Sequence, residues 1–511
     1  MPQRVTSIYF ALLLTVFLLA FPLEGGYTVI TEFKYGLFLA ICGGYVLTIT
    51  ALRISYAATG TTPVGDIRKK LKSISPAAKF MLGFLFFTAL SAVFSAYPGT
   101  LRGAFRREGV LTTGIYVLGS FLLSVYFRPQ KWMLPLLGAV ILPAGAIALV
   151  QLTGANPFTL YPQGYNFYGS GIYYTGEFLS TVGNTAFFAA FLSLACGVLA
   201  MAVIKLEVRG RWFLALPLFI SLLLIFKIGV DAAVVAVLAG LALMLPVAVT
   251  SRKTLANTLG VFAAVVAALA LSRMLGFADG TVRLSVALVH IIFAATAGFT
   301  ALLAVLATKL DIFAKITARQ YRVASTTAVL GGICLALIYL WQYSGESGGM
   351  VYEASQILRG RWHDDFGTRR VFIWRNILER VSWRNLLLGT GPDTLGYWDI
   401  PYFYRVDDAG RTFITNIDAA HNELLHIFAT TGILSLLAYA GAVIAALVNW
   451  YRFPENVLSA IAGAGVLFYV IQALFGISQF ISAPFFWACF GVLAAGCIHS
   501  TKVDTVHQKR V

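Results

Sequence analysis

Long apolar runs dominate this chain, and short polar segments separate them. Runs of about 17–25 residues are long enough to cross a bilayer as helices. The runs predict about fourteen transmembrane helices (twelve to fourteen, because only Lys227, Gly229 and Asp231 break 212–250). They lie near 7–23, 35–52, 78–96, 109–127, 132–152, 181–204, 212–226, 230–250, 256–275, 284–307, 323–342, 421–448, 457–475 and 483–499. We therefore predict an all-α polytopic integral membrane protein.

Charged residues make up 12% of the chain, about half the share in a soluble domain. With the N-terminus in the cytoplasm, 22 of the 38 Lys and Arg residues fall in inner loops and seven in short outer loops. This bias follows the positive-inside rule and predicts that both termini are cytoplasmic. The net charge of +16 thus reflects topology, and no nucleic acid is needed as a partner.

The remaining nine basic residues lie in one polar stretch, 343–420, which we call the outer segment. We predict helices 1–11 within 1–342, this extracytoplasmic subdomain at 343–420, helices 12–14 within 421–499, and a cytoplasmic tail at 500–511. The outer segment has nine arginines, no lysine and ten carboxylates. Arginine binds phosphate through a planar fork, whereas lysine is a point charge. The composition indicates a phosphate-binding surface, with ion pairing to the segment's own carboxylates as the alternative.

Local patterns divide the outer segment. Residues 351–362 predict a short helix, and "TRRVFIWRNILERV" predicts an amphipathic helix with Thr368 as a plausible N-cap. One face of this helix would hold Val371, Trp374, Ile377 or Leu378, and Val381. The glycine-rich "LLLGTGPDTLG" predicts a turn, and 397–418 is expected to be irregular and lid-like.

The start of the twelfth apolar run carries the best candidate for chemistry. If Asp418 caps that helix, His421 lies in its first turn, where the helix dipole keeps the imidazole neutral. A neutral imidazole at a water boundary can take a proton from a hydroxyl, and Asp418 or Asn422 would orient it. The alternative is a polar residue at a helix start. In "HNELLH" the histidines are five apart and do not share a helix face, so no zinc site is predicted, and His426 is expected to be hydrogen-bonded within the bundle.

Arginines in the outer loops are candidates for holding a diphosphate. Arg370 follows Arg369 and shares a helix face with Trp374. Arg102 and Arg106 are four apart, a like-charge pair that is unfavourable without an anion between them. The tyrosine-rich loop 153–177 would suit a sugar, or an interfacial aromatic belt. The five cysteines fall in apolar runs, where we expect small buried side chains and neither a disulfide nor a metal site.

Taken together, these motifs resemble the O-antigen ligase and polymerase superfamily of membrane glycosyltransferases. The resemblance rests on "FGTRRVFIWRNILERV", "LLLGTGPDTLG", "DAAHNELLHIFATTGILSLL" and "VIQALFGISQFISAPFFWACFGVLA". "RREG", which contains Arg107, and "TVGNTAFFAAFL", which contains Asn184, are similar to the family as well.

The resemblance implies a C-type, metal-independent enzyme without a cofactor, on the outer face of the bacterial cytoplasmic membrane. Such enzymes take a glycan from a polyprenyl (undecaprenyl) diphosphate carrier and pass it to lipid A core, protein or another glycan. At the matching positions, His421 would be the base and Arg370 would hold the diphosphate, with Arg107 matching less surely.

The hypothesis that follows is an inverting displacement. His421 deprotonates the acceptor hydroxyl, and Arg370 stabilises the departing diphosphate with help from Arg107 or Arg102. A polymerase of the same superfamily is one alternative. A solute or lipid transporter is another, although transporters usually carry ionisable residues near the midplane and His290 is the main interior candidate here. A scaffold without catalysis would not explain the excess of arginine.

Overall fold

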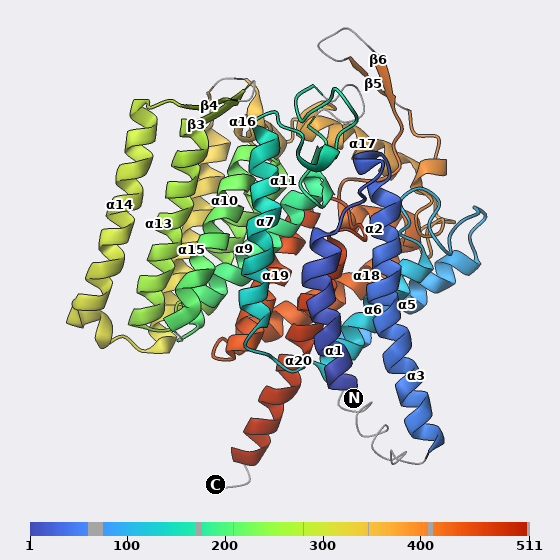
Figure 1. The fold of residues 1–511 in the computed structure, drawn as a ribbon, viewed down its shortest axis with the longest axis horizontal. Helices are drawn as coiled ribbons and strands as arrows, with labels where there is room; N and C mark the ends of the chain where they lie inside the picture. The colour runs from blue at the N-terminus through green and yellow to red at the C-terminus, as the bar shows by residue number, and fades with distance from the viewer. Residues whose placement is uncertain are drawn as a thin grey trace.

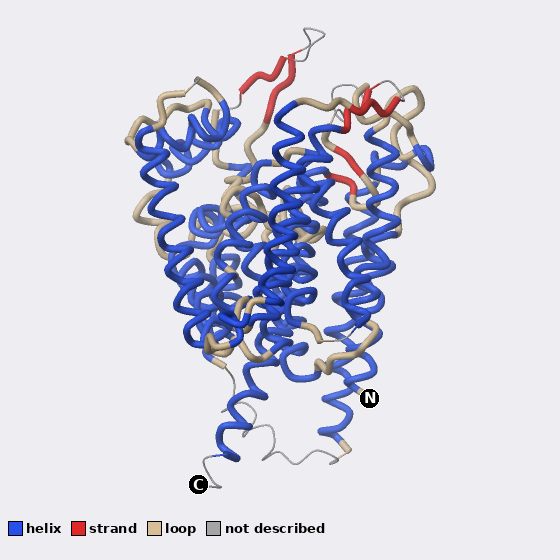
Figure 2. Tube along the Cα trace, turned by 90° about the vertical axis from the view of Figure 1, so that its left-hand side faces the viewer, coloured by secondary structure: helices blue, strands red, loops and turns tan. Residues whose placement is uncertain are grey.

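A computed structural model describes residues 1–59, 75–169, 176–207, 209–278, 281–345, 347–401, 403–406 and 412–507. It is a bundle of roughly aligned helices with three small hairpins (Figures 1 and 2). Both termini lie at one end of the bundle, and the hairpins β3–β4 and β5–β6 lie at the other together with α16 and α17 (Figure 1). The end with the hairpins is called the outer end below.

The first half of the chain forms the N-terminal and central helices. In order, the elements are α1 (Pro2–Leu12), π-helical η1 (Leu13–Phe17), η2 (Gly26–Thr28), α2 (Ile30–Phe38), π-helical η3 (Leu39–Gly43), α3 (Gly44–Ala58), α5 (Pro76–Val93), α6 (Val110–Tyr126), α7 (Met133–Leu152), η4 (Pro157–Thr159), β1 (Phe178–Leu179), β2 (Gly183–Asn184), α9 (Thr185–Lys205), η5 (Arg209–Leu214), α10 (Ala215–Ile228), α11 (Asp231–Leu243) and α12 (Leu245–Ala248).

The second half forms the edge of the bundle, the outer segment and the last three helices. The elements are α13 (Arg252–Met274), β3 (Leu275–Ala278), β4 (Thr281–Leu284), α14 (Leu288–Lys309), η6 (Asp311–Ala314), α15 (Ala318–Gln342), α16 (Gly349–Leu358), α17 (Phe366–Arg380), η7 (Leu395–Tyr397), β5 (Phe403–Val406), β6 (Thr412–Thr415), α18 (Glu423–Arg452), α19 (Val457–Ala473) and α20 (Ala483–His507). The strands of each hairpin pair antiparallel.

Burial divides the helices into a core and an edge. α9 is the central helix: its whole apolar window is buried against α10, α11 and α19. In contrast, only 11% of the α14 window and 6% of the α15 window are buried. Apolar side chains on the outside of a bundle are stable in lipid, where helices satisfy their own backbone hydrogen bonds. This distribution supports a membrane protein.

Among the described residues, nine helices are long and apolar enough to cross a membrane, and four apolar helices are shorter. The prediction of an all-α polytopic membrane protein is confirmed. Fourteen spans and the C-type arrangement remain predictions. Lys34 and Lys227 both donate to backbone carbonyl groups: Lys34 Nζ to Phe17 O (2.6 Å), and Lys227 Nζ to Leu275 O (2.5 Å).

Several local predictions were wrong. The stretch 397–418 was expected to be irregular, but it contains the hairpin β5–β6. The short helix predicted at 351–362 is present as α16, with its bounds shifted to Gly349–Leu358. Cys334 is exposed and Cys489 is only partly buried, whereas Cys42 and Cys196 are buried as expected. Residues 170–175 of the tyrosine-rich loop and the side chain of Cys497 lie outside the described part of the chain.

His290 lies in the first turn of α14 and not in the middle of a span. Its Nδ1 lies 3.1 Å from the Ala287 backbone N–H and 3.0 Å from Ser285 O. This placement is that of a histidine satisfied by its own helix terminus, so it gives no support to a proton relay within a span.

Candidate functional site

The site is built around a break in α18. Gly432 has φ 81° and ψ 175°, which interrupts the helix inside the bundle. The turn 386–396, called the glycine turn below, satisfies the exposed backbone: Ile433 N donates to Leu386 O (2.9 Å), while Thr390 N and Gly391 N donate to Thr430 O (2.9 and 2.7 Å). Because irregular backbone at membrane depth needs protein partners, the outer half of α18 and the glycine turn form one unit.

Asp393 connects this unit to the loop between α5 and α6. Its Oδ2 accepts from the backbone N–H groups of Phe105 (2.9 Å) and Arg106 (2.7 Å). Burial raises the pKa of the Asp393 carboxyl, and these two N–H groups oppose the shift. The loop that carries the predicted arginines is therefore held against the glycine turn.

The start of α18 differs from the prediction. Asn422 is the N-cap, and its side chain accepts from Leu425 N (3.0 Å). His421 lies just before the helix with a positive φ of 49°. Asp418 is not the cap; its Oδ1 instead accepts from Arg106 Nη2 at 2.6 Å. Both Asp and Asn are good caps, so the sequence alone did not separate the two.

Helix α17 brings Arg370 and Trp374 to the same place. Trp374 Nε1 donates to Ala420 O (2.9 Å), which fixes the residue next to His421. Gly367, Thr368 and Arg369 all have positive φ, so the regular helix begins at Arg370 and Thr368 is not its cap. Ile377 is buried and Leu378 is 56% exposed, which settles the choice between them.

Arg370 is partly used and partly available. Its Nη1 donates to Gly367 O (2.8 Å), while its buried Nε has no partner among the described residues. Burial lowers the pKa of Arg370, and the carboxylates of Asp231 and Glu353 oppose this shift. A guanidinium with a buried free donor is suited to an anion that enters the site.

The electrostatic environment of His421 favours the neutral ring. Burial lowers its pKa to about 4, and the guanidinium groups of Arg106 and Arg370 act in the same direction, while Asp418 opposes them. The predicted neutral state is thus supported, but its main causes are burial and two arginines rather than the helix dipole. These causes also show that the two arginines lie within electrostatic range of the imidazole.

Most of the other predicted diphosphate ligands have carboxylate partners. Arg106 pairs with Asp418, Arg107 Nη2 with Glu32 (2.7 Å), and Arg369 with Asp365 (3.4 Å). Arg102 lies over the Tyr35 ring at 5.9 Å.

The loop that holds Arg102 and Arg106 is not helical. The argument from a helical like-charge pair therefore does not apply to them. For Arg106, Arg107 and Arg369, the ion-pair alternative describes the structure.

Two further predictions concern the polar residues Asn184 and His426. The Asn184 side chain caps α9 by accepting from Ala186 N and Phe187 N (2.9 and 3.3 Å), which is a structural role. His426 was expected to be hydrogen-bonded, but its buried Nδ1 has no partner among the described residues. Within that part of the chain, no group of three or more His, Cys, Asp or Glu residues is placed to hold a metal.

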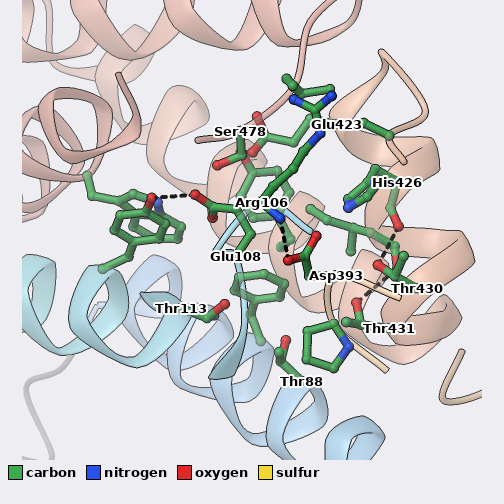
Figure 3. A pocket seen from close by; sticks show the side chains of 18 residues that line it. Thr88, Arg106, Glu108, Thr113, Asp393, Glu423, His426, Thr430, Thr431 and Ser478 are labelled. Carbon is green, nitrogen blue, oxygen red and sulfur yellow. Dashed lines mark hydrogen bonds between the residues drawn. The ribbon is translucent and has the colours of Figure 1, made fainter. Parts of the chain in front are cut away.

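Sequence reasoning missed a polar cavity beneath this cluster. Arg106, Glu108, Asp393, Glu423 and His426 surround it (Figure 3). Its volume is about 60 Å³. Glu108 and Glu423 stand in the quoted motifs "RREG" and "HNELLH", but their meeting depends on residues more than 300 positions apart in the chain. Only the fold brings them together.

Comparison with known families now adds to the geometry. Residues 284–440 match the family model described as O-antigen ligase. This match confirms the predicted relationship to the O-antigen ligase and polymerase superfamily. The matched segment includes Arg370, Asp393 and His421, but the loop with Arg106 lies outside it. A search of curated proteins finds no match to the chain.

Proposed function

We propose that this protein is a glycosyltransferase that moves a glycan from a polyprenyl diphosphate carrier to a hydroxyl acceptor. The reaction would take place on the outer face of the cytoplasmic membrane, without a metal ion. The observation that carries the proposal is the placement of His421, at the start of α18, within electrostatic range of the guanidinium groups of Arg106 and Arg370, which lower its pKa. A neutral imidazole and anion-binding groups in one site suit the deprotonation of a nucleophile and the departure of a diphosphate.

His421 takes the acceptor proton as the hydroxyl oxygen attacks the anomeric carbon. The bond from this carbon to the diphosphate oxygen breaks, and a single displacement inverts the carbon. Arg370 binds the departing diphosphate through its Nε and remaining N–H groups, with Arg102 assisting. Each charge-assisted hydrogen bond to the diphosphate contributes about 1.5–3 kcal/mol to binding. Such a bond increases the rate only as far as it becomes stronger while negative charge develops on the departing diphosphate.

The same arrangement explains how a weakly basic histidine would act as the base. Two guanidinium groups disfavour imidazolium in the free protein. A bound diphosphate brings opposing negative charge, which favours the protonated ring. We therefore expect the pKa of His421 to rise when the donor binds, so that the base becomes effective only when a glycan is present to accept the nucleophile.

The test compares two histidines of the purified protein. His421→Ala should lose glycan transfer from a polyprenyl diphosphate donor. His363→Ala should retain it, because the His363 side chain is 67% exposed and pairs only with Asp365. Transfer by His421→Ala at a rate near that of the unsubstituted protein would show the assignment to be wrong.

A deletion strain tests the acceptor. If the protein is a ligase, glycans should accumulate on the carrier while lipid A core, protein or another surface acceptor stays bare. If it is a polymerase, the acceptor should instead carry short, unpolymerised units. An unchanged glycan profile with lost solute movement would point to a transporter and contradict the proposal.

A further inference from the structure

The polar chamber is the cavity of about 60 Å³ whose lining includes Arg106, Glu108, Asp393, Glu423 and His426. It lies between α5, α6, α18 and the loop after α19, and Asp393 of the glycine turn lines it (Figure 3). A cavity needs about 10–15 Å³ to hold one water molecule. The chamber therefore has room for a few waters.

Five buried polar atoms that line the chamber have no hydrogen-bond partner among the described residues. They are Thr88 Oγ1, Arg106 Nε, Asp393 Oδ1, Glu423 Oε2 and His426 Nδ1. Asp393 is 1% exposed and Glu423 is 4% exposed. An unsatisfied buried polar group costs about 1–3 kcal/mol. Five such atoms around one cavity indicate a polar ligand, and water fits both the volume and the mixture of donors and acceptors.

The two glutamates of the chamber are each held by a tyrosine, and the Phe480 backbone and the Tyr469 side chain also act on Glu108 and Glu423, respectively. Glu423 Oε1 accepts from Tyr439 OH (2.6 Å), which leaves Oε2 as the unpartnered oxygen of a group that lines the cavity. Glu108 Oε1 accepts from Tyr116 OH at 2.9 Å. The tyrosines thus fix the carboxyl groups and leave capacity for water.

His421 is close to this chamber. Ala419 and Glu423, two residues before and two after it, both line the cavity. His426 lines the cavity too and lies within electrostatic range of His421, as does Arg106. His421 is therefore near the lining of the chamber in sequence and within electrostatic range of two of its polar groups.

We propose that the polar chamber holds ordered water that conducts the proton from His421 to Glu423. This inference rests on the proposed function. The acceptor O–H bond breaks as its oxygen bonds to the anomeric carbon, and the electron pair of the broken carbon–oxygen bond leaves on the diphosphate. The proton goes to His421, then through water to a carboxylate oxygen of Glu423. After product release it returns through His421 to bulk water.

The charges around the site give the relay its direction. Once the diphosphate leaves, an imidazolium at His421 is again disfavoured by burial and by two guanidinium groups. Burial and the nearby Asp393 charge raise the pKa of Glu108 to about 8, although the Tyr116 hydrogen bond opposes the shift. The Glu108 carboxyl group thus binds a proton more tightly than His421. The charged and titratable groups that face Glu423 are Arg106, Glu108, Tyr116, Asp393, His426, Tyr439 and Tyr469.

The kinetic test uses Glu423→Gln in the full-length protein. We expect kcat to fall about ten- to hundredfold, within the range of proton-transfer catalysis, with the donor KM unchanged and the pH profile of kcat altered. Glu207→Gln is the matched control, because it makes the same substitution at an exposed glutamate that pairs with Lys253 and does not line the chamber. Glu423→Asp, which keeps a carboxylate, should recover part of the rate. An unchanged kcat and pH profile in Glu423→Gln would overturn the relay.

An infrared measurement tests the chamber without any turnover. The carbonyl band of a protonated carboxyl group should be present at neutral pH, shift in heavy water and disappear in Glu108→Gln. A second such band should grow on acidification and be missing in Glu423→Gln. Absence of both bands would refute proton binding in the chamber. If the unsubstituted protein transfers no glycan, the proposed function fails; if it transfers normally and only these tests fail, the relay alone is wrong.

Discussion

Replacement of Gly432 by alanine tests the central element of the site. At φ 81° and ψ 175° the backbone is in a region that is essentially reserved for glycine, and strain of this kind costs about 1–3 kcal/mol. A Cβ at this position would also overlap the carbonyl oxygen of Leu387 in the glycine turn. Overpacking in a dense interior costs about 1–3 kcal/mol more. The expected loss of stability is thus about 2–6 kcal/mol.

Thermal unfolding of the purified protein in detergent measures this loss. Gly331→Ala is the control, since Gly331 lies within α15 and its added Cβ meets no heavy atom within 4 Å. Alanine should be neutral there or stabilise the helix by up to about 1 kcal/mol. Gly432→Ala should unfold several degrees lower and also lose glycan transfer, because the glycine turn carries Asp393. If both variants unfold at the same temperature as the unsubstituted protein, the glycine turn does not stabilise the break in α18.

Three further predictions follow from the same geometry. Arg370→Lys should lower kcat about hundredfold, as does loss of one donor to a developing anion, whereas Arg361→Lys at an exposed position should have no effect in the same steady-state assay. In the pH profile of kcat/KM, activity should be lost near pH 4, where His421 of the free protein becomes protonated. In the profile of kcat, the loss should come at a higher pH, because the bound diphosphate favours the protonated ring. Activity that is lost in both profiles at the ordinary pKa of histidine would contradict this. Asn422→Ala should lower stability by about 1 kcal/mol in denaturant titrations, while Asn422→Ser keeps a capping oxygen and should be nearly neutral; equal losses would show that the cap contributes little.

A feature of this protein could be predicted from the sequence when its signal lies within a few neighbouring residues. The shared face of Arg370 and Trp374 follows from helical spacing within a few residues, and it was predicted. The break at Gly432 was not, because a lone glycine in an apolar run seldom interrupts a helix. The cap was misassigned because Asp418 and Asn422 are both capping residues.

By itself, the sequence determined the membrane class and the resemblance to the O-antigen ligase family, and it predicted the external position of the outer segment and the roles of Arg370 and His421. These features follow from composition, from charge counts or from patterns within a few residues, so they can be predicted without knowledge of the fold. Tertiary structure decided which arginines have carboxylate partners and where the polar chamber lies. Arg106 and Asp418 are 312 residues apart, and the energy of such a pair depends on a separation of a few ångströms, which only the folded chain defines.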